Sequence, residues 1–140
     1  MRPVLTHLAL HVRDLEASIA FYRAYCGMQL VHERVTDGRR VVWLAEPGRE
    51  HEFIFVLVPG GRGKPQAATD YSHLGFAMES RAAVDAIAAQ AREAGALVWE
   101  PRQEPRDKPL SIMRLSTLCT AGGGAPSLPC PAPITDRDIG

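Results

Sequence analysis

The sequence lacks an excess of charge of either sign and any long apolar run. Its 140 residues carry 16 lysines and arginines and 16 aspartates and glutamates, for a formal net charge of +0 at pH 7. A neutral chain does not offer the basic surface that attracts nucleic acids or acidic membranes. The longest apolar run, Phe53 to Val58, is far too short to span a bilayer. We therefore expect neither nucleic acid nor membrane as a partner.

The chain also lacks a paired set of cysteines and a recognisable export signal. Cys26, Cys119 and Cys130 are odd in number and show no C-x-x-C spacing. That pattern is typical of reduced thiols rather than of a disulfide framework or a thiolate zinc site. The residues from Met1 to Val4 lead into folded-looking sequence without the apolar core of a signal peptide, so the sequence predicts a cytoplasmic protein.

Proline is scarce over the first 100 residues and frequent afterwards. Seven of the 11 prolines lie at or beyond Pro101. Residues 118–140 contain three consecutive glycines and four prolines, with almost no strand alternation or helical period. We expect one folded domain over residues 1–117, followed by an irregular or disordered tail over residues 118–140.

Two segments of the chain match position by position at an offset of 66 residues. The segment from His7 to Val12 (HLALHV) corresponds to the segment from His73 to Met78 (HLGFAM). Each is followed by a good N-cap residue, Asp14 or Ser80, and then by an amphipathic stretch. A glycine stands after each stretch where a helix C-cap belongs; these glycines are Gly27 and Gly95. Each unit is therefore predicted to form a strand, a short turn and a helix.

Further strands are predicted after both helices. In the first module, about residues 4–58, they are Gln29 to Val35, Arg40 to Ala45 and Phe53 to Val58. The first module therefore has the order β-α-β-β-β. A glycine- and proline-rich linker over residues 59–69 leads to a second module over about residues 70–117. Strands of the second module are expected at Ala96 to Glu100 and Leu110 to Thr117.

Strand periodicity divides the residues of the two matching strands between two faces. One face is predicted to pack on the helix, and it carries Thr6, Leu8, Leu10 and Val12 in the first strand and Leu74, Phe76 and Met78 in the second. The opposite face carries Leu5, His7, Ala9 and His11 in the first strand and His73, Gly75 and Ala77 in the second. The small residues on the histidine face leave room, as expected of a concave site.

The histidines suggest a metal site between the two modules. His7 and His11 are four residues apart on a strand, so their Cα atoms lie roughly 13 Å apart and cannot share one ion. His73 occupies the position equivalent to His7, and a pseudo-twofold relation would bring the two together. Two imidazoles make the beginning of a divalent metal site, which usually needs a carboxylate as well. The alternative is a structural or solvent-exposed role for each histidine.

These residues resemble a known family. The run from His7 to Tyr22 (HLALHV-x-DL-x-x-SI-x-FY), ending in Cys26-Gly27-Met28, resembles the opening module of the vicinal oxygen chelate superfamily. That superfamily holds glyoxalase I, fosfomycin-resistance thiol transferases, extradiol dioxygenases, methylmalonyl-CoA epimerase and bleomycin-binding proteins. The run from Asp70 to Phe76 (DYSHLGF) resembles the start of the second module, and the similarity covers about residues 4–105.

The resemblance implies an α+β fold in which paired βαβββ modules form an open, cup-shaped mixed sheet. Here the second module is incomplete at its C-terminal strand. The resemblance also implies a homodimer, a small-molecule substrate and a divalent metal, which could be Fe(II), Mn, Ni or Zn. His7 and His73 match the family's histidine ligands. His11 matches a position that contacts substrate and is the candidate catalytic residue, for substrate contact or proton transfer.

The remaining ligand positions depart from the family pattern. Glyoxalase I-like members take a glutamate from the last strand of the first module, where this chain has Phe55 and Val56. The other glutamate follows a D-P-x-G turn about 45 to 50 residues after the second histidine, near residues 119–123. The turn is missing here, and no glutamate occurs after Glu104.

Three explanations for the missing glutamate are open. We favour a shift of the reading frame near codons 106–118; absence of an encoded D-P-x-G-x-x-x-E in the other two frames would contradict it. Alternatively, the protein has lost its metal and become a binder. The third possibility is a replacement ligand from Cys119, Asp107, Asp136 or Asp138, and Glu52 is the nearest acidic residue in the first module.

The sequence therefore predicts a divalent-metal enzyme that acts on a small oxygen-chelating substrate by electrophilic metal catalysis. Phe55 and Val56 argue against glyoxalase I, and Ala9 replaces the hydroxyl residue that fosfomycin enzymes use in the cup, so a ring-cleaving or other oxygenase-like reaction stays open. One rival prediction is a metal-free binding protein of the bleomycin-sequestering type. Another is a chain inactivated by an altered C-terminus.

Overall fold

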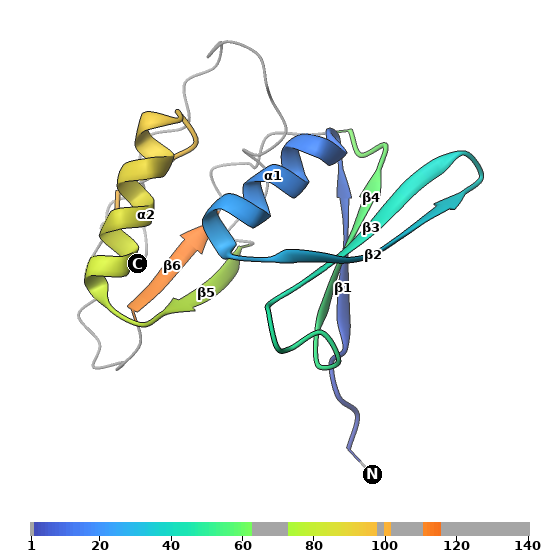
Figure 1. The fold of residues 1–140 in the computed structure, drawn as a ribbon, viewed down its shortest axis with the longest axis horizontal. Coiled ribbons are helices and arrows are strands. Elements are labelled where there is room, and N and C mark those ends of the chain that lie inside the picture. The colour runs from blue at the N-terminus through green and yellow to red at the C-terminus, as the bar shows by residue number, and fades with distance from the viewer. Residues whose placement is uncertain (1, 63–72, 98–99, 102–110, 116–140) are drawn as a thin grey trace, which may run out of the picture. The chain divides into compact units, whose positions relative to one another are not determined.

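In a computed structural model of the chain, the structure describes residues 2–62, 73–97, 100–101 and 111–115 (Figure 1). These residues fall into two compact units, unit 1 within residues 1–64 and unit 2 from residue 65 onward. Among the described residues, neither helix combines the length and the apolar character needed to cross a membrane. The predicted tail over residues 118–140 lies outside the described residues.

Unit 1 is a β-α-β-β-β module, as the sequence predicts. Its elements are β1 (His7–Val12), α1 (Leu15–Cys26), β2 (Gln29–Thr36), β3 (Arg39–Ala45) and β4 (Ile54–Pro59). The strand order in the sheet is β1-β4-β3-β2. Strand β1 runs parallel to β4, and the other two pairs are antiparallel, so the sheet is mixed. The predicted bounds of β2, β3 and β4 are confirmed to within one residue.

Both ends of α1 are set by the residues that the sequence indicates. The Asp14 carboxylate accepts a hydrogen bond from the backbone N–H of Ala17 at 2.9 Å. Gly27 follows the helix with φ 63°, in the left-handed region, and its N–H donates to the Tyr22 carbonyl. Glycine reaches this conformation without the steric penalty that a Cβ atom brings. The predicted N-cap and C-cap are therefore confirmed.

Replacing Asp14 by alanine is expected to lower the free energy of unfolding by about 1 kcal/mol, because no side-chain oxygen would then accept from the Ala17 N–H. Asp14→Asn keeps an acceptor oxygen and is expected to cause a clearly smaller loss. Urea unfolding followed by circular dichroism measures both variants. Equal losses in the two would show that the capping bond is not the stabilising contact.

The turn between β2 and β3 consists of Asp37 and Gly38, with φ angles of 51° and 72°. Two consecutive positive φ values are characteristic of a type I′ turn, for which Asp-Gly is a preferred pair. The turn closes a tight hairpin whose last paired residues are Thr36 and Arg39.

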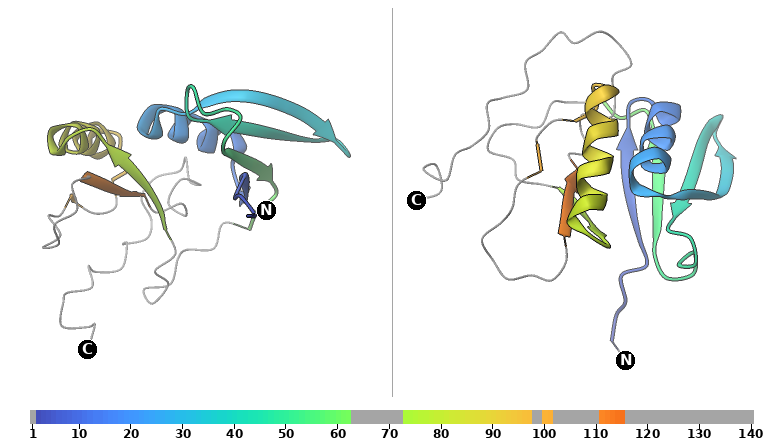
Figure 2. Two further views of the ribbon diagram at one scale, coloured as in Figure 1. Left: turned by 90° about the horizontal axis from the view of Figure 1, so that it is seen from below. Right: turned by 60° about the vertical axis from the view of Figure 1, so that its left-hand side comes forward.

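The core of unit 1 lies between α1 and one face of the sheet, and Figure 2 shows the helix running along that face. The rings of Tyr22 on α1 and Phe55 on β4 are 5.8 Å apart. The buried apolar residues on this side of unit 1 come from the helix, from its two ends and from the three strands beside it. They are Val12, Ile19, Tyr22, Met28, Val42, Leu44, Phe55 and Leu57.

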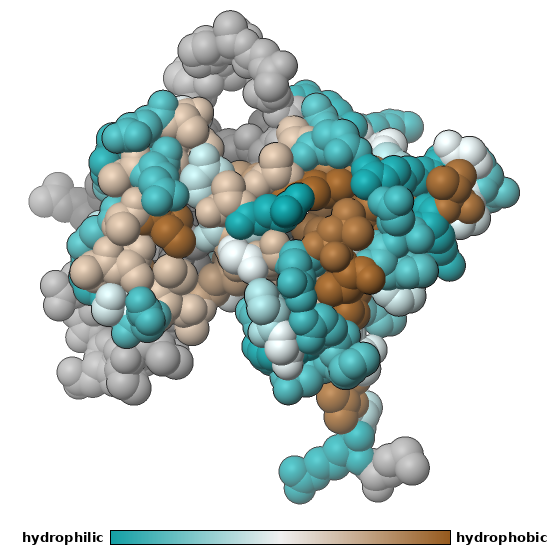
Figure 3. Space-filling model, in the orientation of Figure 1, coloured by the Kyte–Doolittle hydropathy of each residue, from teal (hydrophilic) through white to brown (hydrophobic). Residues whose placement is uncertain are grey.

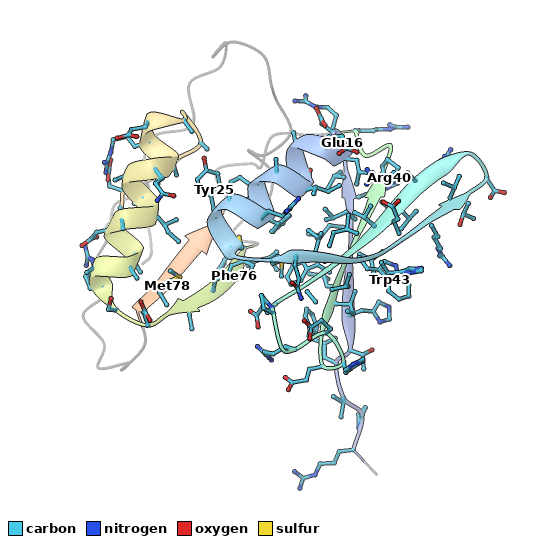
Figure 4. The ribbon with its side chains drawn as sticks, in the orientation of Figure 1. Glu16, Tyr25, Arg40, Trp43, Phe76 and Met78 are labelled. Atoms are coloured by element: carbon cyan, nitrogen blue, oxygen red, sulfur yellow. The ribbon has the colours of Figure 1, made fainter. Side chains whose placement is uncertain are left out.

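An arginine on the same side of the sheet connects the β2–β3 hairpin to the helix. Arg40 of β3 donates from Nη2 to Glu33 of β2 at 2.7 Å and from Nη1 to Glu16 of α1. Figure 4 shows Glu16 and Arg40 close together beside α1. The three charged groups therefore link β2 and β3 to the first turn of the helix.

Unit 2 repeats the strand-turn-helix order. Its described elements are β5 (Leu74–Met78), α2 (Arg81–Glu93) and β6 (Ser111–Leu115), with β5 antiparallel to β6. The Ser80 hydroxyl accepts a hydrogen bond from the Ala83 N–H at 3.1 Å, which confirms the predicted cap. Strand β6 lies within the predicted range from Leu110 to Thr117. The buried apolar residues described in this unit are Phe76, Val84, Ala88 and Ala91.

The strand predicted over Ala96 to Glu100 is wrong for the described part of that range. Ala96, Leu97 and Glu100 have no strand structure, and residues 98–99 lie outside the described residues. The backbone N–H groups of Ala96 and Leu97 both donate to the Ala91 carbonyl, at 2.7 and 3.1 Å. These bonds satisfy the carbonyl end of α2 and keep the two N–H groups out of a sheet ladder.

A few large apolar residues of unit 1 are exposed. Figure 3 shows hydrophobic surface on the segment that precedes β1 and at the outer end of the hairpin. The exposed large apolar residues among those described are Val4, Leu5, Leu30 and Val35. Single exposed apolar residues are common on protein surfaces.

Candidate functional site

Strand β1 separates the two faces of the unit 1 sheet by alternation. Its exposed residues are His7, Ala9 and His11, and its covered residues are Leu8, Leu10 and Val12. Strand β5 of unit 2 alternates in the same way, with Phe76 buried and Gly75 and Ala77 exposed. The predicted division of these strands is therefore confirmed. We call the side of the unit 1 sheet that carries His7 and Ala9 the cup face.

The cup face is hollowed into a pocket of about 620 Å³, a size typical of small-molecule sites. The apolar residues that line it are Ala9, Val41, Trp43, Ile54, Val56 and Val58. The polar residues that line it are Thr6, His7, Arg34, Thr36, Asp37 and Arg39. The histidine face of unit 1 is therefore concave, whereas the contribution predicted for Gly75 and Ala77 belongs to unit 2 and stays a prediction. Thr6 was predicted to face the helix and instead lines the pocket, because it precedes β1 and is not bound by strand alternation.

His7 presents its imidazole at the polar edge of the pocket. The residue is exposed, and its Nδ1 lies 3.2 Å from the hydroxyl oxygen of Thr6. When Nδ1 carries the proton and donates it to that hydroxyl, Nε2 is left with a free lone pair. Metal-binding histidines are commonly oriented by such a bond to the second ring nitrogen. The side chain therefore has the chemistry of a metal ligand.

His73, the second predicted ligand, precedes β5 in unit 2 and is exposed. The predicted metal site thus draws on both units, and its assembly stays a prediction. Among the described residues, no three His, Cys, Asp or Glu side chains gather closely enough to hold a metal ion. The expected position of the missing glutamate, residues 119–123, lies outside the described residues, as do Asp107, Cys119, Asp136 and Asp138.

Strand β4 carries no residue with a carboxylate. Val56 is paired with Ala9 of β1 and lines the pocket, whereas Phe55 is buried on the helix side. The acidic alternative in this region, Glu52, accepts a hydrogen bond from Arg49 Nε at 2.8 Å and does not line the pocket. The structure of unit 1 therefore agrees with the absence of a glyoxalase I-type glutamate at this strand.

His11 lies on the same side of β1 as His7 but at the other end of the strand. Its Nε2 is 3.1 Å from the carbonyl oxygen of Pro59. The chain after β4 packs closely on this end, because a Cβ atom at Gly61 would come within 2.7 Å of the His11 carbonyl oxygen. His11 is not among the residues that line the pocket. Its catalytic role stays a prediction. Because Nε2 is next to the Pro59 carbonyl, Nδ1 is the ring nitrogen that would contact substrate or transfer a proton.

Sequence reasoning left the role of Trp43 open and did not single out the polar end of the pocket. Trp43 lines the pocket, and its indole lies 4.7 Å from the His32 ring, centroid to centroid, at 56°. Figure 4 shows Trp43 on the other side of the strands from Glu16 and Arg40. The missed residues are Arg34 and Arg39. Alternation from Trp43 along β3 to Arg39 could have found the second of them.

Cys26, at the end of α1, has a free thiol. Burial raises the pKa of this thiol to about 12, so the group stays protonated at neutral pH. A protonated thiol is neither a good metal ligand nor a good nucleophile. Cys26 is therefore a packing residue rather than part of the candidate site.

Comparison with known proteins gives two sequence matches. The model of the Glyoxalase/Bleomycin resistance protein/Dioxygenase superfamily matches residues 4–120. The uncharacterized protein PA2024 of Pseudomonas aeruginosa is 50% identical over an alignment of 140 positions that covers 94% of this chain and 100% of that protein. Because the alignment covers 94% of the chain, it continues past residue 118 into the C-terminal segment, where the expected glutamate is missing.

Solved structures show the same fold. A possible glyoxalase from Bacillus cereus superposes with a TM-score of 0.51 at 26% identity, over 65% of this chain and 73% of that chain. The fosfomycin resistance protein FosX of Listeria monocytogenes, in a mutant form complexed with Mn(II) and 1S,2S-dihydroxypropylphosphonic acid, superposes with a TM-score of 0.58 at 17% identity. That match covers 85% of this chain and 88% of FosX, and it concerns the fold alone.

Proposed function

The chain belongs to the glyoxalase/bleomycin resistance protein/dioxygenase superfamily, and from this premise we propose that it is a divalent-metal enzyme acting on a small, oxygen-chelating substrate. The observation that carries the proposal is the position of His7. Its exposed imidazole stands at the edge of a pocket with apolar walls, and one ring nitrogen lies beside the Thr6 hydroxyl. A histidine oriented in this way suits ligation better than packing.

In this proposal His7 and His73 hold the ion, which is Fe(II), Mn, Ni or Zn. When bound, a divalent ion supplies positive charge that stabilises negative charge developing on substrate oxygens. His11 contacts the substrate or transfers a proton through Nδ1, since Nε2 is engaged by Pro59. The apolar walls, Val56 and Trp43 among them, keep water from the bound substrate.

Metal analysis of protein purified without chelators tests the proposal. After addition of Zn, Mn, Ni or Fe(II) and removal of the excess, we expect about one equivalent of one of these metals per chain. Less than about a tenth of an equivalent with every metal would end the enzyme proposal for this chain. The same preparation, treated with a chelator, is expected to lose any turnover that it shows.

A second candidate function is a metal-free binder of a small molecule, of the kind known for bleomycin-type antibiotics. It is favoured by the sequence, which has no glutamate after Glu104, where the family's remaining ligand is expected. The pocket itself suits either function, because its volume and apolar lining are those of a binding site. The metal analysis above separates the two candidates.

We also propose that the protein is a cytoplasmic homodimer. Strands β1 and β2 are the edges of the described four-stranded sheet, and unpaired strand edges favour association with another chain. Light scattering after size-exclusion chromatography should give about twice the chain mass of 15.3 kDa. A mass equal to one chain at micromolar concentration would contradict the dimer.

A further inference from the structure

Two arginines line the cup-face pocket without a carboxylate partner. Among the described residues, Arg34 and Arg39 make no salt bridge, whereas Arg40, in the same hairpin, is bound by both Glu16 and Glu33. Strand alternation explains the difference, because Arg40 faces the helix side and Arg39 faces the pocket. The pocket therefore contains two guanidinium groups whose charge no described side chain neutralises by direct contact.

The register of the hairpin brings these two arginines near each other. Arg34 of β2 is opposite Val41 of β3, and Arg39 is two residues away from Val41 on the same face. Diagonal neighbours of this kind lie about 7–8 Å apart, within the reach of two long side chains toward one group. Asp37, at the turn, also lines the pocket, so this end carries two positive charges and one negative charge.

An apolar surface continues from the arginines into the pocket. Val41 and Trp43 follow Arg39 at alternate positions of β3, and Val56 of β4 is paired with Trp43. The indole is held against the His32 ring at 4.7 Å, which fixes a flat surface beside the cationic end. Planar molecules favour such a surface because they bury apolar area and stack on the aromatic ring.

We propose that the substrate is an organic anion. Its planar or apolar body packs on Trp43 and Val41, and its acidic group is held by Arg34 and Arg39. The guanidinium fork binds a carboxylate or a phosphate with paired hydrogen bonds. The residues Leu10, Leu57, Val42 and Glu33 form one row across the sheet, with Arg34 and Arg39 on one side of the row and His7 on the other. The acidic group is therefore held at the end of the pocket away from His7, and the body of the substrate extends from there toward His7. This inference rests on the proposed function in taking the bound molecule as the substrate.

The test compares three probes of one shape in chelator-treated protein: 2-naphthoate, 2-naphthyl phosphate and the neutral 2-naphthamide. Calorimetry should show that at least one of the two anions binds about tenfold or more tightly than the amide, because charge-assisted hydrogen bonds are stronger than neutral ones. The ranking of the two anions identifies a carboxylate or a phosphate as the preferred group. Equal affinity for all three probes would overturn the proposal.

Substitutions of the two arginines test whether these residues cause the preference for anionic probes. The double variant Arg34→Gln with Arg39→Gln should lose the preference for the anion and keep its affinity for the amide. Arg23→Gln removes an arginine from α1 that makes no salt bridge with a described residue and does not line the pocket, and it should keep the preference. Asp37→Asn should raise anion affinity by roughly threefold, because one repelling charge is lost. A preference that survives in the double variant would overturn the assignment.

The test of the anion site is independent of the test of the metal-enzyme proposal, because binding of the probes is measured without metal. Anion preference in a protein that binds no metal would leave the pocket assignment standing and remove the enzyme proposal. Metal binding without anion preference would support the enzyme proposal and overturn the assignment of the pocket to an organic anion. Melting temperatures of the double variant and wild type should agree within about 2 °C, since no described salt bridge is removed.

Discussion

Alanine at His7 and alanine at His73 are each expected to lower the affinity for the bound divalent metal by about 100-fold or more. In the proposed site the two imidazoles are the ligands that the chain supplies from its two repeated strands. Loss of a group that only orients a ligand already costs on the order of 10- to 100-fold in affinity, so loss of a ligand itself should cost at least as much. Competition with a chromogenic chelator measures the change.

The matched control is His51→Ala. His51 is exposed, follows β3 in a loop and does not line the pocket, so its removal should leave metal affinity within about twofold of wild type. Unchanged affinity in His7→Ala or in His73→Ala would remove that histidine from the site. Because the two residues belong to different units, parallel losses in both variants would also show that one ion binds residues of both units.

Leu57→Ala is expected to lower the free energy of unfolding by about 3 kcal/mol, within the usual range of about 2–5 kcal/mol for buried leucines. Leu57 is 0% exposed and lies on β4, an inner strand of the described sheet, between Leu10 of β1 and Val42 of β3. The substitution removes apolar contacts and leaves a cavity between the sheet and α1. Urea unfolding followed by circular dichroism measures the loss.

The control for Leu57→Ala is the same substitution at Leu5, which is 75% exposed. It should change stability by less than about 0.5 kcal/mol, because surface substitutions remove little buried area. A loss below about 1 kcal/mol for Leu57→Ala would contradict the described packing of β4. Similar losses at the two positions would do the same.

Most of the fold of unit 1 could be predicted, because its signals are local. Asp14 and Gly27 bound the helix through hydrogen bonds to backbone groups within a few residues. Asp37 and Gly38 form the turn through their own φ angles. The repeat itself shows which strands carry equivalent residues. The parallel pairing of β1 with β4 is different, since it joins residues 47 apart, such as His7 and Ile54, and no local pattern encodes that register.

The candidate site could be predicted only in part, for a related reason. The histidines stand out because the repeat places His7 and His73 at equivalent positions. Arg34 and Arg39 do not, since arginines on an exposed hairpin are usually solvated, and the pocket that they line is formed together with residues of β1 and β4. The failed strand after α2 has a local cause, because the N–H groups of Ala96 and Leu97 donate to the Ala91 carbonyl at the end of the helix.

The Arg40 bridge to Glu16 and Glu33 has a consequence for how this pocket can change during evolution. The bridge fixes the β2–β3 hairpin from behind, through residues that never meet the pocket. Substitutions at Arg34 or Arg39 on the opposite face are therefore free to alter what the pocket accepts while the hairpin keeps its place. In the proposed site, the residues that would set ligand preference and the residues that support the hairpin alternate along the same two strands.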